Sequence, residues 1–310
     1  MRASLAIGTM LLAGCAAQRL EKEHAHWLGA FGTMAPPGTL PIGNGLYYDE
    51  TEVTNFYWLE YEYWVRTVMD SAAVVGTLPD TTVWVRPKHY GEPMVDYYLR
   101  HPAYKDYPVV GVTYDQALAY SKWRGDRVME SWLVWAGIIT RRKDQTMDDH
   151  FTIEGFYATD SLKAYHHLPY PSYALPNYAE WRIAVGVADS LARVNLPRCK
   201  KFKSSEFRGA RFTECSDVVR DGRFKINSND VSGGDPVAPT NCERCERPLI
   251  WQLRGNVAEL SADSTLSLGG GWTDRLDSIL LDQPFPNHAP NAATGFRNVC
   301  RWRKWDGVRH

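Results

Sequence analysis

Three stretches of the chain show the 3.6-residue spacing of apolar side chains that is typical of amphipathic helices. The first covers residues 55–69 and begins with residues that can cap free backbone amides. In the second, Thr113 and Gln116 have the spacing of a capping box, in which each side chain accepts a hydrogen bond from the other residue's backbone. In the third, Asn177 precedes Glu180 by the same interval. The pattern predicts three helices that pack one face on a core.

Turns and short strands should connect these helices. Gly and Pro cluster over residues 31–46, where turns should lead into a strand at residues 46–48. Near the C-terminus, residues 301–305 alternate cations with indole rings. A final strand with one solvated face would have this pattern, and so would a membrane interface or a partner surface. No internal repeat or low-complexity linker divides the chain.

Residues 128–139 are apolar on nearly every side of a predicted helix and are followed at once by a basic run, residues 141–143. A helix of this kind is either deeply buried or covered by another surface. Burial is the commoner outcome, and docking of a partner is the alternative.

Composition and charge exclude several classes of partner. The chain has 310 residues, of which 44% are hydrophobic, so it can bury one large core or two ordinary ones. Its 35 Lys and Arg residues nearly balance 36 Asp and Glu residues. No global field therefore attracts nucleic acid or an anionic membrane.

The N-terminus resembles a bacterial lipoprotein signal. An apolar run over residues 3–12 ends in small residues and Cys15. This predicts a signal peptide over residues 1–14, lipidation of Cys15 and a polar tether over residues 15–30. A frayed terminus or a first buried helix is the alternative, and the run is too short to span a bilayer.

Export would place the remaining cysteines in an oxidising compartment, where disulfides persist. Cys199, Cys215, Cys242 and Cys245 are candidates for one or two structural disulfides. The Cys-X-X-Cys spacing at Cys242 also suits zinc or redox chemistry, but no second pair completes a zinc pattern. Cys300 would be left over as a free thiol.

A series of motifs in a defined order carries a family resemblance. They are Glu52–Asn55, Tyr107–Thr113, Leu175–Trp181, Gly255–Glu259, Gly269–Trp272 and Gly295–Arg297. In this order they resemble the formylglycine-generating enzyme (sulfatase-modifying factor) family over about residues 31–301. The resemblance implies an α+β fold, a variant of the C-type-lectin fold that is poor in regular secondary structure. A single domain would then occupy residues 31–310, with an insertion at about 128–174 that strengthens the partner-docking interpretation.

The N-terminal half is most similar to the gliding-motility and type IX secretion lipoproteins of the GldK, PorK and GldJ kind. The segments that carry this similarity are residues 48–55, 63–66, 79–86 and 101–108. It implies a structural or scaffold component of a cell-envelope assembly, bound to protein partners and held by a lipid anchor. We expect the protein at the outer membrane, facing the periplasm. The cell surface is the alternative location.

The same resemblance argues against the family's reaction. Active members bind copper through two cysteines, placed three and eight residues after a Gly-Gly-Ser element, and oxidise a substrate cysteine. Here these positions hold Asp274 and Ile279. The serine is Gly271, and a tryptophan that lines the family's substrate cleft is Ala258. The resemblance thus implies an inactive protein without copper, because soft Cu(I) requires thiolates. The alternatives are a copper site rebuilt around Cys300, and a protein that binds a ligand in the lectin-type cleft without turnover.

The resemblance also implies a structural calcium site. In the family a structural ion is held by side-chain and backbone oxygens that correspond to Gln252, Gly255, Val257 and Glu259. Hard oxygen ligands of this kind suit Ca²⁺. The alternative is a tight turn in which Glu259 forms a salt bridge.

Overall fold

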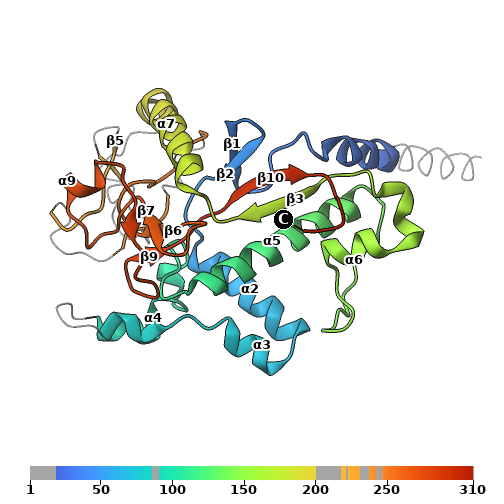
Figure 1. The fold of residues 1–310 in the computed structure, drawn as a ribbon, viewed down its shortest axis with the longest axis horizontal. Helices are drawn as coiled ribbons and strands as arrows, with labels where there is room; N and C mark the ends of the chain where they lie inside the picture. Colours follow the sequence, from blue (N-terminus) through green and yellow to red (C-terminus); the bar gives the residue numbers. More distant parts are fainter. Residues whose placement is uncertain are drawn as a thin grey trace, which may run out of the picture. The chain divides into compact units, whose positions relative to one another are not determined.

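The computed structural model describes residues 19–85, 91–199, 218–220, 223–230, 237–241, 245 and 247–309. The chain divides into two compact units (Figure 1). The large unit comprises Pro37–Trp123 and Tyr173–Arg301. The small unit comprises the described residues up to Pro36, the segment Arg124–Ser172 and the residues from Trp302 onward. Each unit is thus built from segments that are far apart in the sequence.

Helices and strands are short and numerous. The helices with defined bounds are α2 (Asn55–Val68), α3 (Ser71–Gly76), η1 (Thr81–Val85), α4 (Glu92–Tyr97), η2 (Pro102–Tyr104), α5 (Tyr114–Trp135), α6 (Ile153–Ala158), η3 (Asp160–Tyr165), α7 (Tyr178–Asn195), η4 (Leu196–Arg198) and α9 (Leu276–Ile279). The strands are β1 (Thr39–Gly43), β2 (Leu46–Asp49), β3 (Tyr170–Ala174), β4 (Val219–Arg220), β5 (Arg223–Phe224), β6 (Ala258–Leu260), β7 (Leu266–Leu268), β8 (Phe285–Pro286), β9 (Thr294–Gly295) and β10 (Val299–Arg303). Within the described part of the chain, no helix has the length and apolar character needed to cross a membrane.

The strands form three small sheets. Their orders are β1-β2-β10-β3, β8-β7-β6-β9 and β4-β5. In the first sheet β2 pairs antiparallel with both β1 and β10 (Figure 1). Tyr48 therefore lies opposite Leu40 and Val299. In the second, β6 is antiparallel to β7 and parallel to β9. Helices mixed with short strands and long irregular stretches confirm the predicted α+β class.

All three predicted helix starts are confirmed. The Thr54 side chain caps α2, and the Thr113 and Gln116 pair forms its two reciprocal hydrogen bonds at the start of α5. Asn177 and Glu180 form a complete capping box at α7. These interactions span three residues, so the local sequence suffices to specify them.

Residues 128–135 of the predicted apolar segment form the end of α5, which is continuous from Tyr114 to Trp135. Residues 136–139, which were also predicted to be helical, form a turn and a bend after it. The end of α5 supplies part of the core of the small unit. The Trp132 ring lies 5.6 Å from those of Trp27 and Phe31 and 4.9 Å from that of Trp302. Burial is therefore the outcome for Trp132, whereas Trp135 at the helix end stays exposed. The proposed insertion shares its core with residues from both ends of the chain.

The N-terminal segment in front of this core is helical over residues 19–30. Only its last turn contributes buried or half-buried residues, which are Trp27 and Ala30. The predicted tether therefore includes an ordered helix, whose end packs in the small unit. Cys15 and the predicted signal peptide lie outside the described residues.

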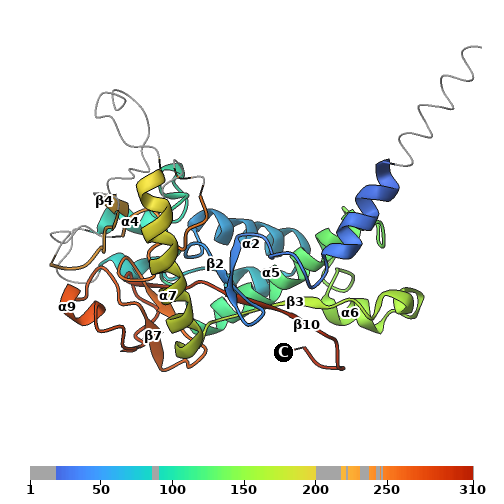
Figure 2. The same ribbon diagram turned by 90° about the horizontal axis from the view of Figure 1, so that it is seen from above.

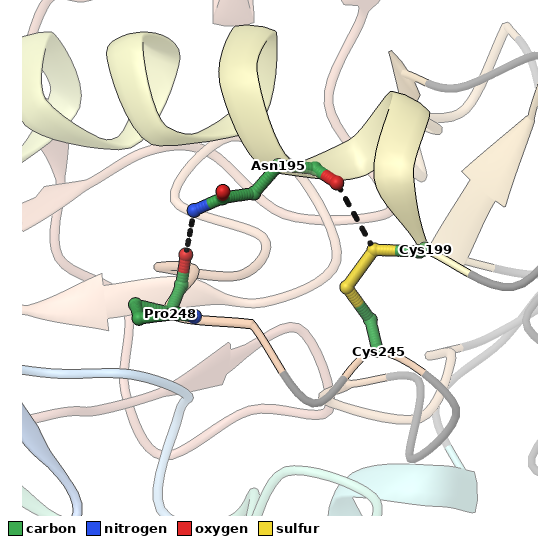
Figure 3. Close-up of a disulfide and its surroundings, with 4 residues drawn as sticks. All are labelled: Asn195, Cys199, Cys245 and Pro248. Atoms are coloured by element: carbon green, nitrogen blue, oxygen red, sulfur yellow. Dashed lines mark hydrogen bonds between the residues drawn. A yellow bond between two sulfur atoms is a disulfide. The ribbon is translucent and has the colours of Figure 1, made fainter.

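A disulfide joins Cys199, just after η4, to Cys245 (Figure 3). The neighbouring Asn195 side chain donates a hydrogen bond of 2.8 Å to the Pro248 carbonyl, which links the same two segments (Figure 3). Cys300 on β10 is buried and is not part of a disulfide. Cys215 and Cys242, the other two candidates, lie outside the described residues. In this structure Cys245 is thus engaged outside the Cys-X-X-Cys pair.

Removing this bridge should destabilise the large unit. The two cysteines are 46 residues apart, and opening a loop of this length typically costs about 2–4 kcal/mol of unfolding free energy. We expect Cys199→Ser to lower the urea midpoint accordingly under oxidising conditions. Reducing agent should lower the midpoint of the parent protein and leave that of the variant nearly unchanged. Equal midpoints for parent and variant would contradict the prediction.

Candidate functional site

The loop that leads into β6 has an unusual backbone. Gln252, Gly255 and Asn256 all have positive φ angles, of 49°, 76° and 63°. A Cβ atom on Gly255 would lie 2.5 Å from the Asn227 carbonyl oxygen, so glycine is required by space as well as by conformation. The chain turns sharply here, because three residues of one short stretch adopt the left-handed conformation.

Asn256 ties this loop to two distant segments. Its side-chain oxygen accepts a hydrogen bond of 2.7 Å from the Ala238 amide. Its amide nitrogen donates one of 3.0 Å to the Glu52 carboxyl group. Because Asn256 is fully buried, each of these bonds replaces one to water. The Gly-Asn pair therefore has a structural role: Gly255 permits the turn, and Asn256 links the loop to two distant segments.

A buried charge cluster lies beside the loop. The Arg297 Nε atom donates a hydrogen bond of 2.6 Å to Glu259 Oε1, and Arg297 Nη2 lies 3.7 Å from Glu52 Oε2. All three side chains are 0% exposed. Burial raises the pKa of Glu259 to about 8 and that of Glu52 to about 7, although Arg297 lowers both. One guanidinium faces two carboxyl groups, so a proton or a second cation is needed for charge balance.

Three of the four predicted calcium ligands, Gln252, Gly255 and Val257, lie on this loop, and Glu259 lies on β6 directly after it. All four are buried. Two of their side-chain oxygens, Gln252 Oε1 and Glu259 Oε2, have no hydrogen-bond partner among the described residues. The Gln252 amide nitrogen donates to the Pro239 carbonyl and so orients the side chain. The residues therefore fit Ca²⁺, which favours mixed carboxylate, amide and carbonyl oxygens. The salt bridge of the alternative interpretation is also present, through Glu259 Oε1.

In the part of the chain that the structure describes, no three His, Cys, Asp or Glu side chains lie close enough together to hold a metal ion. Any ion held by the loop would thus depend on carbonyl and amide oxygens together with Glu259. The sequence motif indicated these ligands. It did not show that Glu52 and Arg297 come together with Glu259, because these residues belong to three separate motifs.

Asp274 and Ile279, the two positions that the resemblance assigns to the family's copper ligands, make structural contacts. Asp274 Oδ2 accepts a hydrogen bond of 2.7 Å from the Gly271 amide, and the Asp274 amide donates one of 3.0 Å to the Gly271 carbonyl. Ile279, at the end of α9, is 1% exposed. A Cβ atom on Gly270 would lie 2.7 Å from Ile279 Cγ1. A turn and an apolar contact occupy these positions, and neither residue offers a thiolate.

The two other departures from the family pattern meet at one backbone segment. A Cβ atom on Gly271 would lie 2.6 Å from the Ala293 carbonyl oxygen and 3.3 Å from the Ala258 nitrogen. The Ala258 amide in turn donates a hydrogen bond of 2.8 Å to the same carbonyl. The chain around Ala293 therefore fills the space that the family's serine would need. The sequence contained no signal for Ala293, because its contacts depend on long-range packing.

Restoring the serine should therefore be costly. We expect Gly271→Ser to lower the free energy of unfolding by about 1–3 kcal/mol, since the new side chain has to displace backbone. Gly186→Ser is the matched control, because a Cβ atom at this exposed position in α7 meets nothing within 4 Å. Chemical denaturation of both variants tests the prediction. If Gly271→Ser is as stable as the control, the backbone around Ala293 can move to make room for the side chain, and the prediction is wrong.

The described cysteines provide one free thiol. Cys199 and Cys245 are joined, and Cys300 is buried in β10, where it lies opposite Tyr47. A Cu(I) site built from two thiolates would need a second free cysteine beside it. The described part of the chain does not supply one.

Comparisons with known proteins agree with the motif pattern. A family model described as "Sulfatase-modifying factor enzyme 1-like domain" matches residues 8–299. Among solved structures, the chain is similar to Treponema denticola variable protein 1, with 14% identity and a TM-score of 0.38, over 83% of this chain and 84% of that one. It is also similar to a chain from "Crystal Structure of CarF", with 16% identity and a TM-score of 0.39, over 84% and 87%. No curated protein matches the chain.

Proposed function

The chain belongs to the family of proteins with a sulfatase-modifying factor enzyme 1-like domain, and we propose that it is a catalytically silent member of that family. The observation that carries this proposal is the role of the two copper-ligand positions. Asp274 closes a turn with Gly271, and Ile279 is packed in the interior. Carboxylate and alkyl groups cannot replace thiolates for soft Cu(I). In addition, the backbone at Ala293 occupies the space beside Gly271 in which the family's serine side chain would lie.

We further propose that the protein is a lipoprotein that acts as a scaffold in a cell-envelope assembly, of the gliding-motility or type IX secretion kind. Two independent sequence features support this role: the lipobox ending at Cys15, and the motifs over residues 48–108 that resemble such lipoproteins. Its partners would then be other envelope proteins, with the lipid anchor in the outer membrane.

An assay of copper binding and cysteine oxidation tests the loss of activity. The full chain should neither oxidise a peptide with the family's substrate cysteine nor bind Cu(I) more tightly than a Cys300→Ser variant does. An active enzyme of the family is the positive control. Tight Cu(I) binding that Cys300→Ser abolishes would refute the proposal and support the rival view, an oxidase with a rebuilt copper site.

Purification of the intact protein from detergent-solubilised envelopes tests the scaffold role. Envelope proteins should copurify in constant ratio with the parent chain. Recovery of the chain by itself after mild crosslinking would contradict a scaffold. Deleting residues 128–174 is a poor test, because the deletion would expose the core that Trp27 and Trp302 share with Trp132.

Calcium should stabilise the fold if the loop before β6 holds it. Gln252, the carbonyls of Gly255 and Val257, and Glu259 would bind the ion, which would supply positive charge beside the two buried carboxyl groups. We expect calcium at about a hundred times its dissociation constant to add about 2.7 kcal/mol to stability. Thermal melts in calcium and in chelator measure this, with Gln252→Met as the variant that should lose the shift and magnesium as the control ion. Identical melts in calcium and chelator would rule out the site.

A further inference from the structure

The helix over residues 19–30 has few contacts of its own to stabilise it. This helix is drawn in dark blue in Figure 2. Its side chains are exposed except for Trp27, which is half-buried, and Ala30, which is buried. The Trp27 ring anchors it, 4.4 Å from Trp135 and 5.6 Å from Trp132. The helix therefore holds one fixed position while most of its surface remains uncovered by the described residues.

A second contact fixes the same helix to the end of α5. At Gly137, with φ of 70°, a Cβ atom would lie 2.5 Å from the His24 ring. His24 and Trp27 lie three residues apart on one side of the helix, and Leu20 continues that side one turn earlier. The helix is thus held at two points, and Leu20 extends past them toward the N-terminus.

Large apolar side chains are exposed around this helix. Leu20 is 54% exposed, Leu28 40%, Met34 39% and Trp135 40%. Leu28 lies eight residues after Leu20 and therefore on the same broad side of the helix as Leu20, His24 and Trp27. Trp135 packs on the Trp27 ring, and Met34 follows the helix, where its amide donates a hydrogen bond to the Ala30 carbonyl. We call these four side chains the apolar face. It includes an exposed indole beside aliphatic groups, a combination that is typical of the membrane–water interface.

The length of chain before the helix limits what can cover this face. Cys15 lies four residues before Arg19, and four extended residues span at most about 14 Å. If Cys15 carries acyl chains, Arg19 is therefore within that distance of the bilayer. Charge does not oppose the approach, because Arg19 and Lys22 balance Glu21 and Glu23.

We infer that the apolar face of Leu20, Leu28, Met34 and Trp135 rests on the lipid surface into which Cys15 is anchored. This rests on the proposed lipoprotein, and it adds a second, protein-made contact to the acyl anchor. Burial of apolar side chains to a shallow depth in the interface supplies the attraction. The contact holds the small unit against the membrane in one orientation, where a flexible tether would leave it free to turn.

Photocrosslinking tests the inference on the full lipidated chain in vesicles of phosphatidylethanolamine and phosphatidylglycerol. Benzoylphenylalanine is placed at Leu28, at Trp135 or, as a control, at Val194, an exposed position of α7 in the large unit. Phospholipid adducts at Leu28 and Trp135 should exceed those at Val194 at least five-fold. Equal yields, or adducts with another protein chain, would overturn the inference.

A paired substitution provides a second measurement. With benzoylphenylalanine at Trp135, Leu20→Glu combined with Leu28→Glu should reduce the lipid adduct at least five-fold, whereas Leu280→Glu with Leu281→Glu should not. All four side chains are exposed, so the fold should tolerate both pairs, which thermal melts verify. An equal adduct in both variants contradicts the inference.

The mass of the N-terminal peptide distinguishes failure of the proposed lipid anchor at Cys15 from failure of the proposed membrane contact of the apolar face. An unacylated Cys15 would refute the anchor and the face together. An acylated chain without adducts would refute the face alone.

Discussion

Replacing Arg297 by alanine is expected to cost about 3–5 kcal/mol of the free energy of unfolding. Arg297 is the counter-charge for Glu259 at 2.6 Å and for Glu52 at 3.7 Å, and all three groups are fully buried. Its guanidinium also donates a hydrogen bond of 2.9 Å to the Trp251 carbonyl. Without it, two fully buried carboxyl groups lose their counter-charge and the Trp251 carbonyl loses a hydrogen-bond donor. Protonation of the carboxyl groups, whose pKa burial already raises, recovers only part of the loss.

Urea unfolding followed by tryptophan fluorescence measures this effect. Arg275→Ala is the matched control, because Arg275 forms its ion pair with Asp277 where both side chains are about two-thirds exposed. Exposed pairs of this kind contribute about 0–1 kcal/mol. If Arg297→Ala shifts the midpoint no more than Arg275→Ala does, then water reaches the cluster and the charge-balance argument for a bound cation loses its basis.

Replacing Trp132 by alanine should destabilise the small unit by about 3–5 kcal/mol, because a large buried ring leaves a cavity. Trp132 is 2% exposed and contacts Trp27, Phe31 and Trp302. Its loss should therefore release the N-terminal helix, the insertion and the C-terminal segment together. Trp135→Ala, which removes the same side chain from an exposed position of the same helix, should cost clearly less.

Hydrogen exchange resolves the effect by region. Protection in Trp132→Ala should fall in residues 19–36, 124–172 and 302–309, and should persist in β6 and β7. Loss of protection in the insertion only would show that the chain ends pack there weakly. Unchanged protection in all three segments would contradict a shared core.

Local chemistry made much of the fold predictable. A capping box spans three residues, so Thr113 and Gln116, or Asn177 and Glu180, mark helix starts in any context that allows a helix. The motif order likewise indicated the family, and the predicted calcium ligands lie within eight residues of one another, from Gln252 to Glu259. The absence of thiols at Asp274 and Ile279 was visible from the residue types themselves.

The arrangement of the candidate site was beyond local patterns. Arg297 meets Glu259, 38 residues away, and Glu52 from another motif. The space beside Gly271 is filled by Ala293, whose small side chain carries no pattern. The apolar half of α5 could be predicted to need cover, but apolar periodicity does not identify the covering residues.

Residue types and contacts within a few positions predicted the capped helices, and the order of the motifs predicted the family and, through it, the α+β class. The residue types also place no thiol at Asp274 or Ile279. The tertiary structure, in contrast, brings residues from both ends of the chain into the core around Trp132 and sets one guanidinium beside two carboxyl groups. Such contacts join residues far apart along the chain, and their partners are selected by how the whole interior packs.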